Sequence, residues 1–298
     1  MGWRNVIISS SAKLSLSSNQ LVINGDSSNT IPIEDINVIV IENQQSTITA
    51  KLMDKLAQEE VIVYICDEKH IPSGIYLPFN NHSRQAKMVR TQIEVSKPLI
   101  KRCWQQIVMQ KINNQAKCLE LLGFDGYEKM KKVAKEVISG DESNREAVAA
   151  KMYFKFLFND FIRGNDDITN AALNYGYSIL RGAIARTIVA YGFIVSLGIH
   201  HKSELNNFNL ADDLIEPFRP IVDLWVAQNM INKEEFDRED KIKLVSLLGC
   251  DCIINEEKHS VNHAIDIMVA SLVSTYSNGD YKKLLLPQII PIKVHEYE

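Results

Sequence analysis

Short apolar runs rich in β-branched residues alternate with Ser, Asn and Gly over the first eighty residues, a pattern typical of strands joined by turns. Residues 46–60 form the one helical repeat in this region, with Ile48, Leu52 and Leu56 on one face and Ser46 able to cap the start. The expected strands are NVIIS, LSLSS, LVING, TIPIE, VIVIE, VIVYICD and SGIYLP. We therefore expect a small, mostly antiparallel β-domain over residues 1–82.

Beyond residue 82 the apolar period lengthens to that of helices, and Pro and Gly become sparse. Pro98 lies where a first helical turn is expected, and Ile100, Trp104, Ile107 and Lys111 follow about one turn apart. Further helical runs are SNREAVAAKMYFKFLF, NAALNYGYSILRGAIARTIVAYGF, LADDLIEPFRPIVDLWVAQNM, REDKIKLVSLLG and VNHAIDIMVASLVSTY. The pattern predicts a basic linker helix over 83–96 and a larger all-helical domain over 97–298, which makes the fold class α+β.

Composition places the chain among globular proteins, because 46% of its 298 residues are hydrophobic and 23% are charged. The opening MGWRNVIISS lacks an apolar segment of signal-peptide length, and the longest uncharged apolar stretch, residues 187–199, falls short of the ~20 residues that span a membrane. The five cysteines match no common zinc spacing. We expect reduced thiols in a cytoplasmic protein without membrane contact.

The net charge of −4 argues mildly against a nucleic-acid partner, but the charge is unevenly distributed. Between residues 84 and 117 there are eight basic residues and one acidic residue, Glu94. The basic ones are Arg84, Lys87, Arg90, Lys97, Lys101, Arg102, Lys111 and Lys117. This stretch is either a track for phosphates or an ordinary solvated helix face.

Candidate chemistry is confined to carboxylates and histidines, because the chain has no glycine-rich phosphate loop, no G-x-S-x-G and no H-E-x-x-H. In residues 197–220, Asp213 and Glu216 are three positions apart and share a helix face. The Asn-rich loop before them is long enough to fold His201 back over that helix. The alternative is a solvated acidic surface with exposed histidines.

Glu146 is a second candidate, although Ser143 and Glu146 also fit a capping box at a helix start. Alanines at 147, 149 and 150 would let another helix approach closely, and a glutamate buried there would need a cation. One imidazole and two carboxylates suit Mn²⁺ or Mg²⁺ with water in the remaining positions. A site that used both His200 and His201 would instead suit iron.

Four segments, SNREAVAAKMYF, NAALNYGYSILR, LGIHH and FNLADDLIEPFRPIVD, resemble the CRISPR-associated spacer integrase family, CRISPR-associated protein one. The opening MGWRNVIISS and the segment EPFRPIVD look like its type II branch, and the resemblance covers nearly the whole chain. The resemblance implies that the catalytic metal ligands are Glu146, His201 and Glu216, and that the adjacent His200 is not a ligand. Asp213 matches an acidic position near the site, where it either supports a ligand or forms a salt bridge to Arg219.

The resemblance implies a metal-dependent DNA integrase of CRISPR adaptation, which joins 3′-OH ends of short DNA fragments into the CRISPR repeat and also has endonuclease activity. It implies a homodimer formed through the β-domains, with residues 97–298 as the catalytic domain. Two dimers would be bridged by a dimer of CRISPR-associated protein two, and a type II effector nuclease and a ring-shaped accessory protein would take part. The alternative is a catalytically inactive DNA-binding scaffold of the same assembly.

Candidate DNA contacts come from the basic stretch and from three arginines further along the chain. Arg181 and Arg186 lie in an apolar helix, so each needs a carboxylate or a phosphate as partner, and the sequence leaves both open. The full set of candidates is Arg84, Lys87, Arg90, Lys101, Arg102, Arg181, Arg186 and Arg219.

Overall fold

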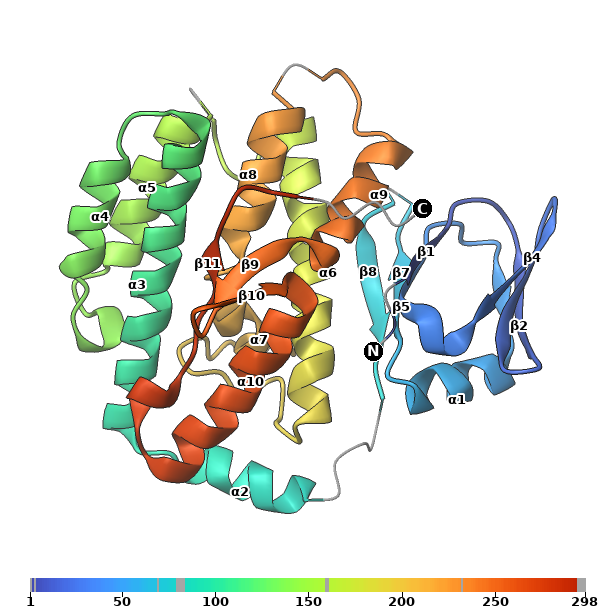
Figure 1. Cartoon of the computed structure of the whole chain (residues 1–298), viewed down its shortest axis with the longest axis horizontal. Coiled ribbons are helices and arrows are strands. Elements are labelled where there is room, and N and C mark those ends of the chain that lie inside the picture. Colours follow the sequence, from blue (N-terminus) through green and yellow to red (C-terminus); the bar gives the residue numbers. More distant parts are fainter. Residues whose placement is uncertain are drawn as a thin grey trace. The chain divides into compact units, whose positions relative to one another are not determined.

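The structure, a computed structural model, describes residues 2, 4–68, 70–78, 84–158, 161–231 and 233–293 (Figure 1). Two compact units divide the chain, residues 1–83 and residues 84–298. The expected mixture of helices and strands, with a β region at the N-terminus, is confirmed. The elements of the first unit are β1 (Arg4–Ile8), β2 (Lys13–Ser17), β3 (Gln20–Asn24), β4 (Ser28–Pro32), β5 (Ile36–Ile41), β6 (Thr47–Ile48), α1 (Ala50–Gln58), β7 (Ile62–Cys66) and β8 (Pro72–Tyr76).

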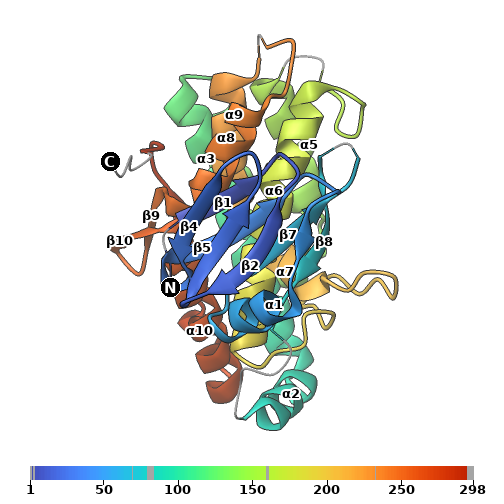
Figure 2. The ribbon, with the colours of Figure 1, turned by 90° about the vertical axis from the view of Figure 1, so that its right-hand side faces the viewer.

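The first unit contains two four-stranded sheets, in the orders β1-β5-β7-β8 and β4-β3-β2-β6 (Figure 2). Three strand pairs are parallel, namely β1–β5, β5–β7 and β2–β6, and three are antiparallel, namely β2–β3, β3–β4 and β7–β8, so the unit is mixed rather than mostly antiparallel as expected. The physical reason is the crossover through α1, which brings β7 back beside β5 in the same direction. All six residues of β5 are buried, as is usual for an inner strand of a parallel sheet.

Helix α1 begins later than the sequence suggested. Thr49 is its N-cap and accepts a hydrogen bond from the Leu52 amide, whereas the Ser46 hydroxyl accepts one from the Ala12 amide at 3.2 Å. Ser46 therefore fastens the segment before the helix instead of capping it. Leu52 and Leu56 lie fully buried in the core of this unit, as expected of the apolar face, whereas Ile48 lies before the helix in β6 and is partly buried against the same core.

The second unit is mainly helical. Its helices are α2 (Gln85–Glu94), α3 (Lys97–Leu122), α4 (Tyr127–Lys135), α5 (Arg145–Leu157), α6 (Ile168–Ala190), α7 (Asn209–Leu214), α8 (Arg219–Asn229), α9 (Arg238–Ser246) and α10 (Val261–Asn278). A three-stranded sheet, β10-β9-β11, contradicts the all-helical expectation; its strands are β9 (Asp251–Ile254), β10 (Glu257–Ser260) and β11 (Gln288–Ile289). Asn255 and Glu256 both have positive φ, the backbone of a tight two-residue hairpin turn, and they reverse the chain between β9 and β10.

Helix α3 is the long support of the candidate site. Pro98 lies in its first turn, as expected, and Gly123 ends it in the left-handed conformation. The buried face includes Lys111, Asn114 and Gln115 among its apolar residues. The Asn114 amide donates to the carbonyl oxygens of Pro217 at 2.7 Å and Pro287 at 2.8 Å, which fastens the segment around Glu216 to the middle of α3.

The run LADDLIEPFRPIVDLWVAQNM does not form one helix. It forms α7 and α8, separated by residues 215–218, which include Glu216 and Pro217. The proline lacks an amide hydrogen and disfavours helical backbone in the residue before it, which accounts for the interruption at Glu216. Elsewhere, no helix among the described residues has the length and apolar character to cross a membrane. All five cysteines are buried, and none of them forms a disulfide among the described residues.

Candidate active site

Glu146 lies in the first turn of α5, and its helix is capped by a residue that the sequence analysis missed. The Asp141 carboxylate accepts hydrogen bonds from the amides of Arg145 at 2.8 Å and Glu146 at 3.0 Å. Asn144, at the N-cap position, has positive φ and no capping side-chain bond, so the capping box from Ser143 to Glu146 is wrong. Because Asp141 satisfies the helix end, the Glu146 side chain is left to pair elsewhere.

Lys111 joins Glu146 to Glu216. Its Nζ lies 2.6 Å from Oε1 of Glu146 and also pairs with Oε2 of Glu216. The second oxygen of Glu216, Oε1, pairs with Nε of Arg219 at 3.0 Å. The exposed fraction is 10% for the Lys111 side chain and 5% for Glu216. Two carboxylates from distant parts of the chain therefore meet at one buried ammonium.

The charges in this cluster reinforce one another. Burial of Glu216 opposes its ionisation, but the positive charges of Arg219 and Lys111 outweigh burial and lower the pKa of Glu216 to about 2. Burial likewise disfavours the charged form of Lys111, yet the carboxylates of Glu216 and Glu146 raise its pKa above the ordinary value. At neutral pH the cluster thus contains an ionised Glu216 and a protonated Lys111.

Asp213 holds His201 and the loop that carries it. The Asp213 carboxylate is fully buried and lies 2.7 Å from Nδ1 of His201. The same carboxylate accepts hydrogen bonds from the amides of His200 at 3.0 Å and His201 at 3.1 Å, and a third from the Ile199 amide. The bond to Asp213 raises the pKa of His201. The loop does fold His201 back toward α7, and the suggested salt bridge from Asp213 to Arg219 is not formed, because Arg219 pairs with Glu216.

The two adjacent histidines have different surroundings. The His200 ring stacks on the buried Trp104 ring, with centroids 4.2 Å apart and planes within 2°. The His201 ring lies edge-on to His200, with centroids 5.7 Å apart. A site that uses both imidazoles side by side is not present among the described residues, and His201 is the histidine linked to a buried carboxylate.

Within the part of the chain that the structure describes, no group of three His, Cys, Asp or Glu side chains is arranged to hold a metal ion. Glu146 and Glu216 converge on Lys111, while the charge of Glu216 contributes to the raised pKa of His201. The donor set nevertheless suits a divalent ion. Glu146 and Glu216 supply carboxylate oxygens, and a histidine whose Nδ1 binds a carboxylate offers Nε2, the usual arrangement of metal-binding histidines. The metal set remains a prediction.

A hollow of about 170 Å³ lies beside the cluster. Its charged and polar walls are Lys111, Gln115, Arg163, Glu216, Arg219 and Asp223. Arg163 was missed by the sequence analysis because it follows an apolar run in a loop with no motif of its own. It donates to the amide oxygens of Asn170 and Asn174, both at 2.6 Å, and among the described residues it pairs with no carboxylate. Its guanidinium group lines the hollow together with Arg219.

Asp223 on α8 is a third buried carboxylate near the cluster, and it was not among the residues predicted for the site. It accepts hydrogen bonds from the hydroxyls of Tyr153, at 3.0 Å, and Tyr177. Burial raises the pKa of Asp223 to about 6, despite the opposing effect of these two bonds. Both tyrosines are fixed by this pairing, and Tyr177 also lies under the Arg219 guanidinium, 4.5 Å from its ring centroid.

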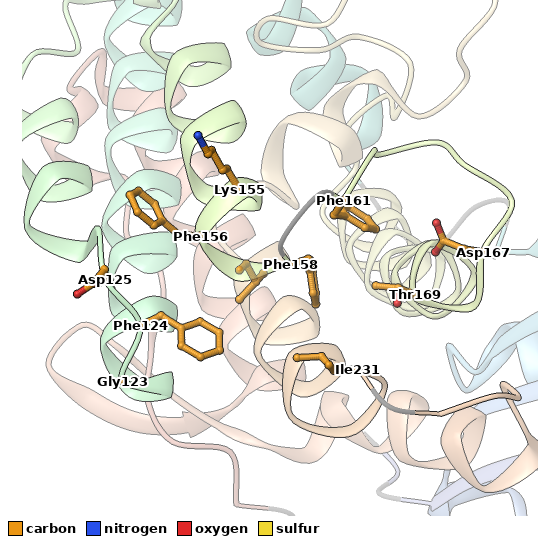
Figure 3. Close-up of a pocket in the computed structure, with 11 residues that line it drawn as sticks. Gly123, Phe124, Asp125, Lys155, Phe156, Phe158, Phe161, Asp167, Thr169 and Ile231 are labelled. Carbon is orange, nitrogen blue, oxygen red and sulfur yellow. The ribbon is translucent and has the colours of Figure 1, made fainter.

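A larger hollow, of about 690 Å³, lies near the ends of α3 and α5. Figure 3 shows Phe124, Phe156, Phe158 and Phe161 around it. Phe154, in the wall of the smaller hollow, contacts Phe161 with ring centroids 5.6 Å apart, so aromatic rings connect the two. The large hollow is lined by none of Glu146, His201 and Glu216, whereas Glu216 lines the smaller one and His201 lines a third hollow of about 650 Å³.

The candidate DNA contacts fall into two groups. Arg84, Lys87 and Arg90 are exposed along α2 and its start. The buried Gln92 of the same helix binds the backbone of Ile194 and Leu197, so α2 is fastened to the loop that leads to His201. This places an exposed basic face on the same support as the imidazole.

The other candidates have protein partners. Arg181 pairs with Asp212 at 2.7 Å, which answers the question of its partner in favour of a carboxylate. Arg186 is buried and donates to Asn262 at 2.7 Å. On α3, Lys101 pairs with Glu142 at 2.7 Å and Arg102 donates to Gln105 at 3.1 Å.

Comparison with known proteins identifies the family. The family described as CRISPR associated protein Cas1 matches residues 6–260. Over 306 aligned residues, the chain is 44% identical to the CRISPR-associated endonuclease Cas1 of Neisseria meningitidis serogroup C (strain 8013), with 100% of both proteins covered. The chain therefore belongs to the Cas1 family, and the resemblance inferred from its motifs is confirmed.

Solved structures agree in fold. A casposase bound to an integration product matches with a TM-score of 0.76 and 18% identity, covering 93% of this chain and 91% of that one. A chain of a Cas6-RT-Cas1–Cas2 complex matches with a TM-score of 0.72 and 16% identity, covering 96% of this chain and 36% of that one. At such identities the likeness concerns the fold.

Proposed function

We propose that this protein is a divalent-metal-dependent DNA integrase of CRISPR adaptation that joins the 3′-OH ends of short DNA fragments into the CRISPR repeat, with accompanying endonuclease activity. The observation that carries the proposal is the meeting of Glu146 and Glu216 at one buried cation, near an imidazole held by Asp213. The name of the Neisseria relative, an endonuclease, and the casposase with its integration product support the same chemistry.

Glu146, Glu216 and Nε2 of His201 would hold Mn²⁺ or Mg²⁺. When bound, the ion supplies charge stabilisation at the phosphoryl oxygen. Asp213 keeps the imidazole oriented through Nδ1, and Arg163 and Arg219 offer guanidinium groups to the negative charge of the phosphate in the adjoining hollow.

The chain supplies no nucleophile in this reaction. A DNA 3′-hydroxyl attacks the phosphodiester in line and gives its proton to solvent as a new P–O bond forms. The old P–O bond breaks, and the leaving oxygen of the cleaved strand takes up a proton from solvent and departs as a hydroxyl. Water in place of the hydroxyl gives hydrolysis instead. The cysteines are unsuited to covalent catalysis, because burial raises the pKa of Cys103 and of Cys250 to about 12 and keeps both as thiols.

DNA would reach the site along α2, where Arg84, Lys87 and Arg90 are exposed. The partners of the active assembly would be a second copy bound through the β-domain and a dimer of CRISPR-associated protein two, with a type II effector nuclease and a ring-shaped accessory protein. The solved complex of a related chain with Cas2 supports the second of these partners. The assembly would work in the cytoplasm.

The test is the joining of labelled DNA ends to a supercoiled plasmid that carries a repeat, in the presence of Mn²⁺. We expect joined product with the wild type and none with Glu146→Gln, which should keep nearly unchanged DNA affinity when Mn²⁺ is absent. Glu142→Gln is the matched control, because Glu142 lies four positions earlier with 62% of its side chain exposed and should keep full activity. A wild type that binds the DNA but joins none of it would instead support the inactive scaffold.

A further inference from the structure

We propose that Lys111 competes with the divalent ion for Glu146 and Glu216, so that the ion binds tightly only together with the DNA phosphate. This inference rests on the proposed metal site and deepens it. Lys111 lies in the middle of α3, with 10% of its side chain exposed, and pairs with both carboxylates. No motif in the sequence marks this residue as part of the site.

The reason for a cation at this position is electrostatic. Two ionised carboxylates that face each other in a buried site repel, and each would raise the pKa of the other. The Lys111 ammonium removes this repulsion, and Arg219 adds a second positive charge at Glu216. Lys111 and Arg219 thus offset the charges of Glu146 and Glu216, and the site is electrically balanced without a metal.

A divalent ion at the same carboxylates would disturb this balance. It would add two positive charges beside Lys111 and Arg219, in a hollow of only about 170 Å³. A phosphodiester carries a negative charge and would offset part of that excess. The ion and the phosphate should therefore bind cooperatively, and Lys111 is the residue that sets the strength of the coupling.

The structure also offers a position for the displaced ammonium. Gln115 lies four residues after Lys111 on the same helix face and lines the same hollow. Its Oε1 atom is buried and accepts no hydrogen bond among the described residues. The flexible Lys111 side chain can turn toward this oxygen and toward the entering phosphate, whereas Arg219 keeps its own bond to Glu216.

The experiment measures Mn²⁺ binding from the electron paramagnetic resonance signal of the free ion, with no reaction taking place. The DNA is a short duplex with dideoxy 3′ ends, which cannot be joined. We expect the wild type to bind Mn²⁺ at least about tenfold more tightly with this DNA than without it. Lys111→Met should bind Mn²⁺ at least about tenfold more tightly than the wild type without DNA, and DNA should add little further.

Lys117→Met is the matched control, because Lys117 lies on the same helix but has 42% of its side chain exposed and pairs with Glu120. It should bind Mn²⁺ like the wild type when DNA is absent. Equal or weaker Mn²⁺ binding by Lys111→Met than by the wild type, without DNA, would overturn the proposal. If Lys111→Met does not fold, the Mn²⁺ affinity of the wild type with and without DNA tests the proposal. An affinity that DNA does not change contradicts the proposed coupling.

Glu216→Gln separates this inference from the metal site on which it rests. Mn²⁺ binding that survives in Glu216→Gln shows that the ion is held elsewhere, and the proposed metal set then fails together with the role of Lys111. A second outcome is that Glu216→Gln loses Mn²⁺ binding but Lys111→Met binds Mn²⁺ like the wild type. That result supports the proposed metal ligands and refutes only the competition by Lys111.

Discussion

Asp213 and Glu216 are buried carboxylates three positions apart, yet their partners are of different kinds. Asp213, in α7, binds three backbone amides and the His201 ring, so its charge holds a loop in place. Glu216, after the end of α7, binds the side chains of Lys111 and Arg219. Backbone donors cannot leave, whereas a side-chain cation can be exchanged for a metal ion. We infer that Asp213 supports the structure of the site, whereas Glu216 takes part in the proposed chemistry.

The largest expected effect is on activity, and it falls on the proposed metal ligands, of which Glu216 is one. His201→Ala and Glu216→Gln should each lower DNA strand joining by on the order of 10³-fold or more, because each removes a proposed ligand worth several kcal/mol in the transition state. His200→Ala is the control, since His200 stacks on Trp104 and is no proposed ligand. Joining is measured with labelled ends and Mn²⁺. Equal activity of His201→Ala and the wild type would remove His201 from the site.

The next effect is on stability and should fall on Asp213. Asp213→Asn replaces one acceptor oxygen by an amide that faces backbone N–H donors, so we expect a loss of about 3 kcal/mol in the free energy of unfolding. Glu216→Gln leaves the buried charges of Lys111 and Arg219 short of one partner, so it should also destabilise, by about 3–5 kcal/mol. Urea denaturation of the two variants measures both losses. An unchanged stability of Asp213→Asn would show that its carboxylate does not hold the loop.

Sequence analysis named side chains that the structure brings together, but not the bonds that join them. The spacing of Asp213 and Glu216 suggested one shared helix face, but α7 ends at Leu214 and Glu216 lies beyond it. Glu146 does pair with a cation, as expected of a partly buried glutamate, although its helix is capped by Asp141 and not by Ser143. Lys111 was placed both in the basic stretch and on the face of its helix that carries Trp104 and Ile107, but a sequence does not reveal which distant carboxylates such a lysine faces.

The fold was predictable where the pattern is local. The β-branched runs of the first unit and the helical repeats of the second were recognised, since both depend on alternation within a few residues. The parallel pairing of β5 with β1 and β7 was missed, because strand direction depends on connections and not on the strand itself. The β9–β10 hairpin was missed because its turn, Asn255 and Glu256, lacks the glycine that usually marks such turns.

Asp223 extends the comparison to a buried carboxylate that is paired with neither a backbone amide nor an adjacent cation. Its pKa is raised from 3.8 to about 6. The folded state therefore binds this proton more tightly than the unfolded chain, and the stability that it contributes is lost as the pH rises from about 4 to about 6. Asp223→Asn should be up to about 3 kcal/mol more stable than the wild type near neutral pH. The gain should vanish below about pH 4. Urea denaturation at several pH values measures it, and a gain independent of pH would contradict the titration of Asp223.

The exposed basic residues along α2 and its start contrast with the three buried carboxylates. Their replacement should have the smallest effect on stability and should be visible only in DNA binding. Replacing Arg84, Lys87 and Arg90 by Ala should change the free energy of unfolding by less than about 0.5 kcal/mol. Each of these residues that neutralises a duplex phosphate releases condensed counterions, so the triple variant should bind DNA more weakly and its salt dependence should be shallower by up to about three units. The loss should be equal for all DNA sequences, because phosphate contacts carry no sequence information.

The matched control replaces three exposed lysines at the same spacing on α4, namely Lys129, Lys132 and Lys135. Both triple variants change the net charge equally, so a salt titration in which they behave alike would show that the general field of the protein, and not a track along α2, determines the affinity.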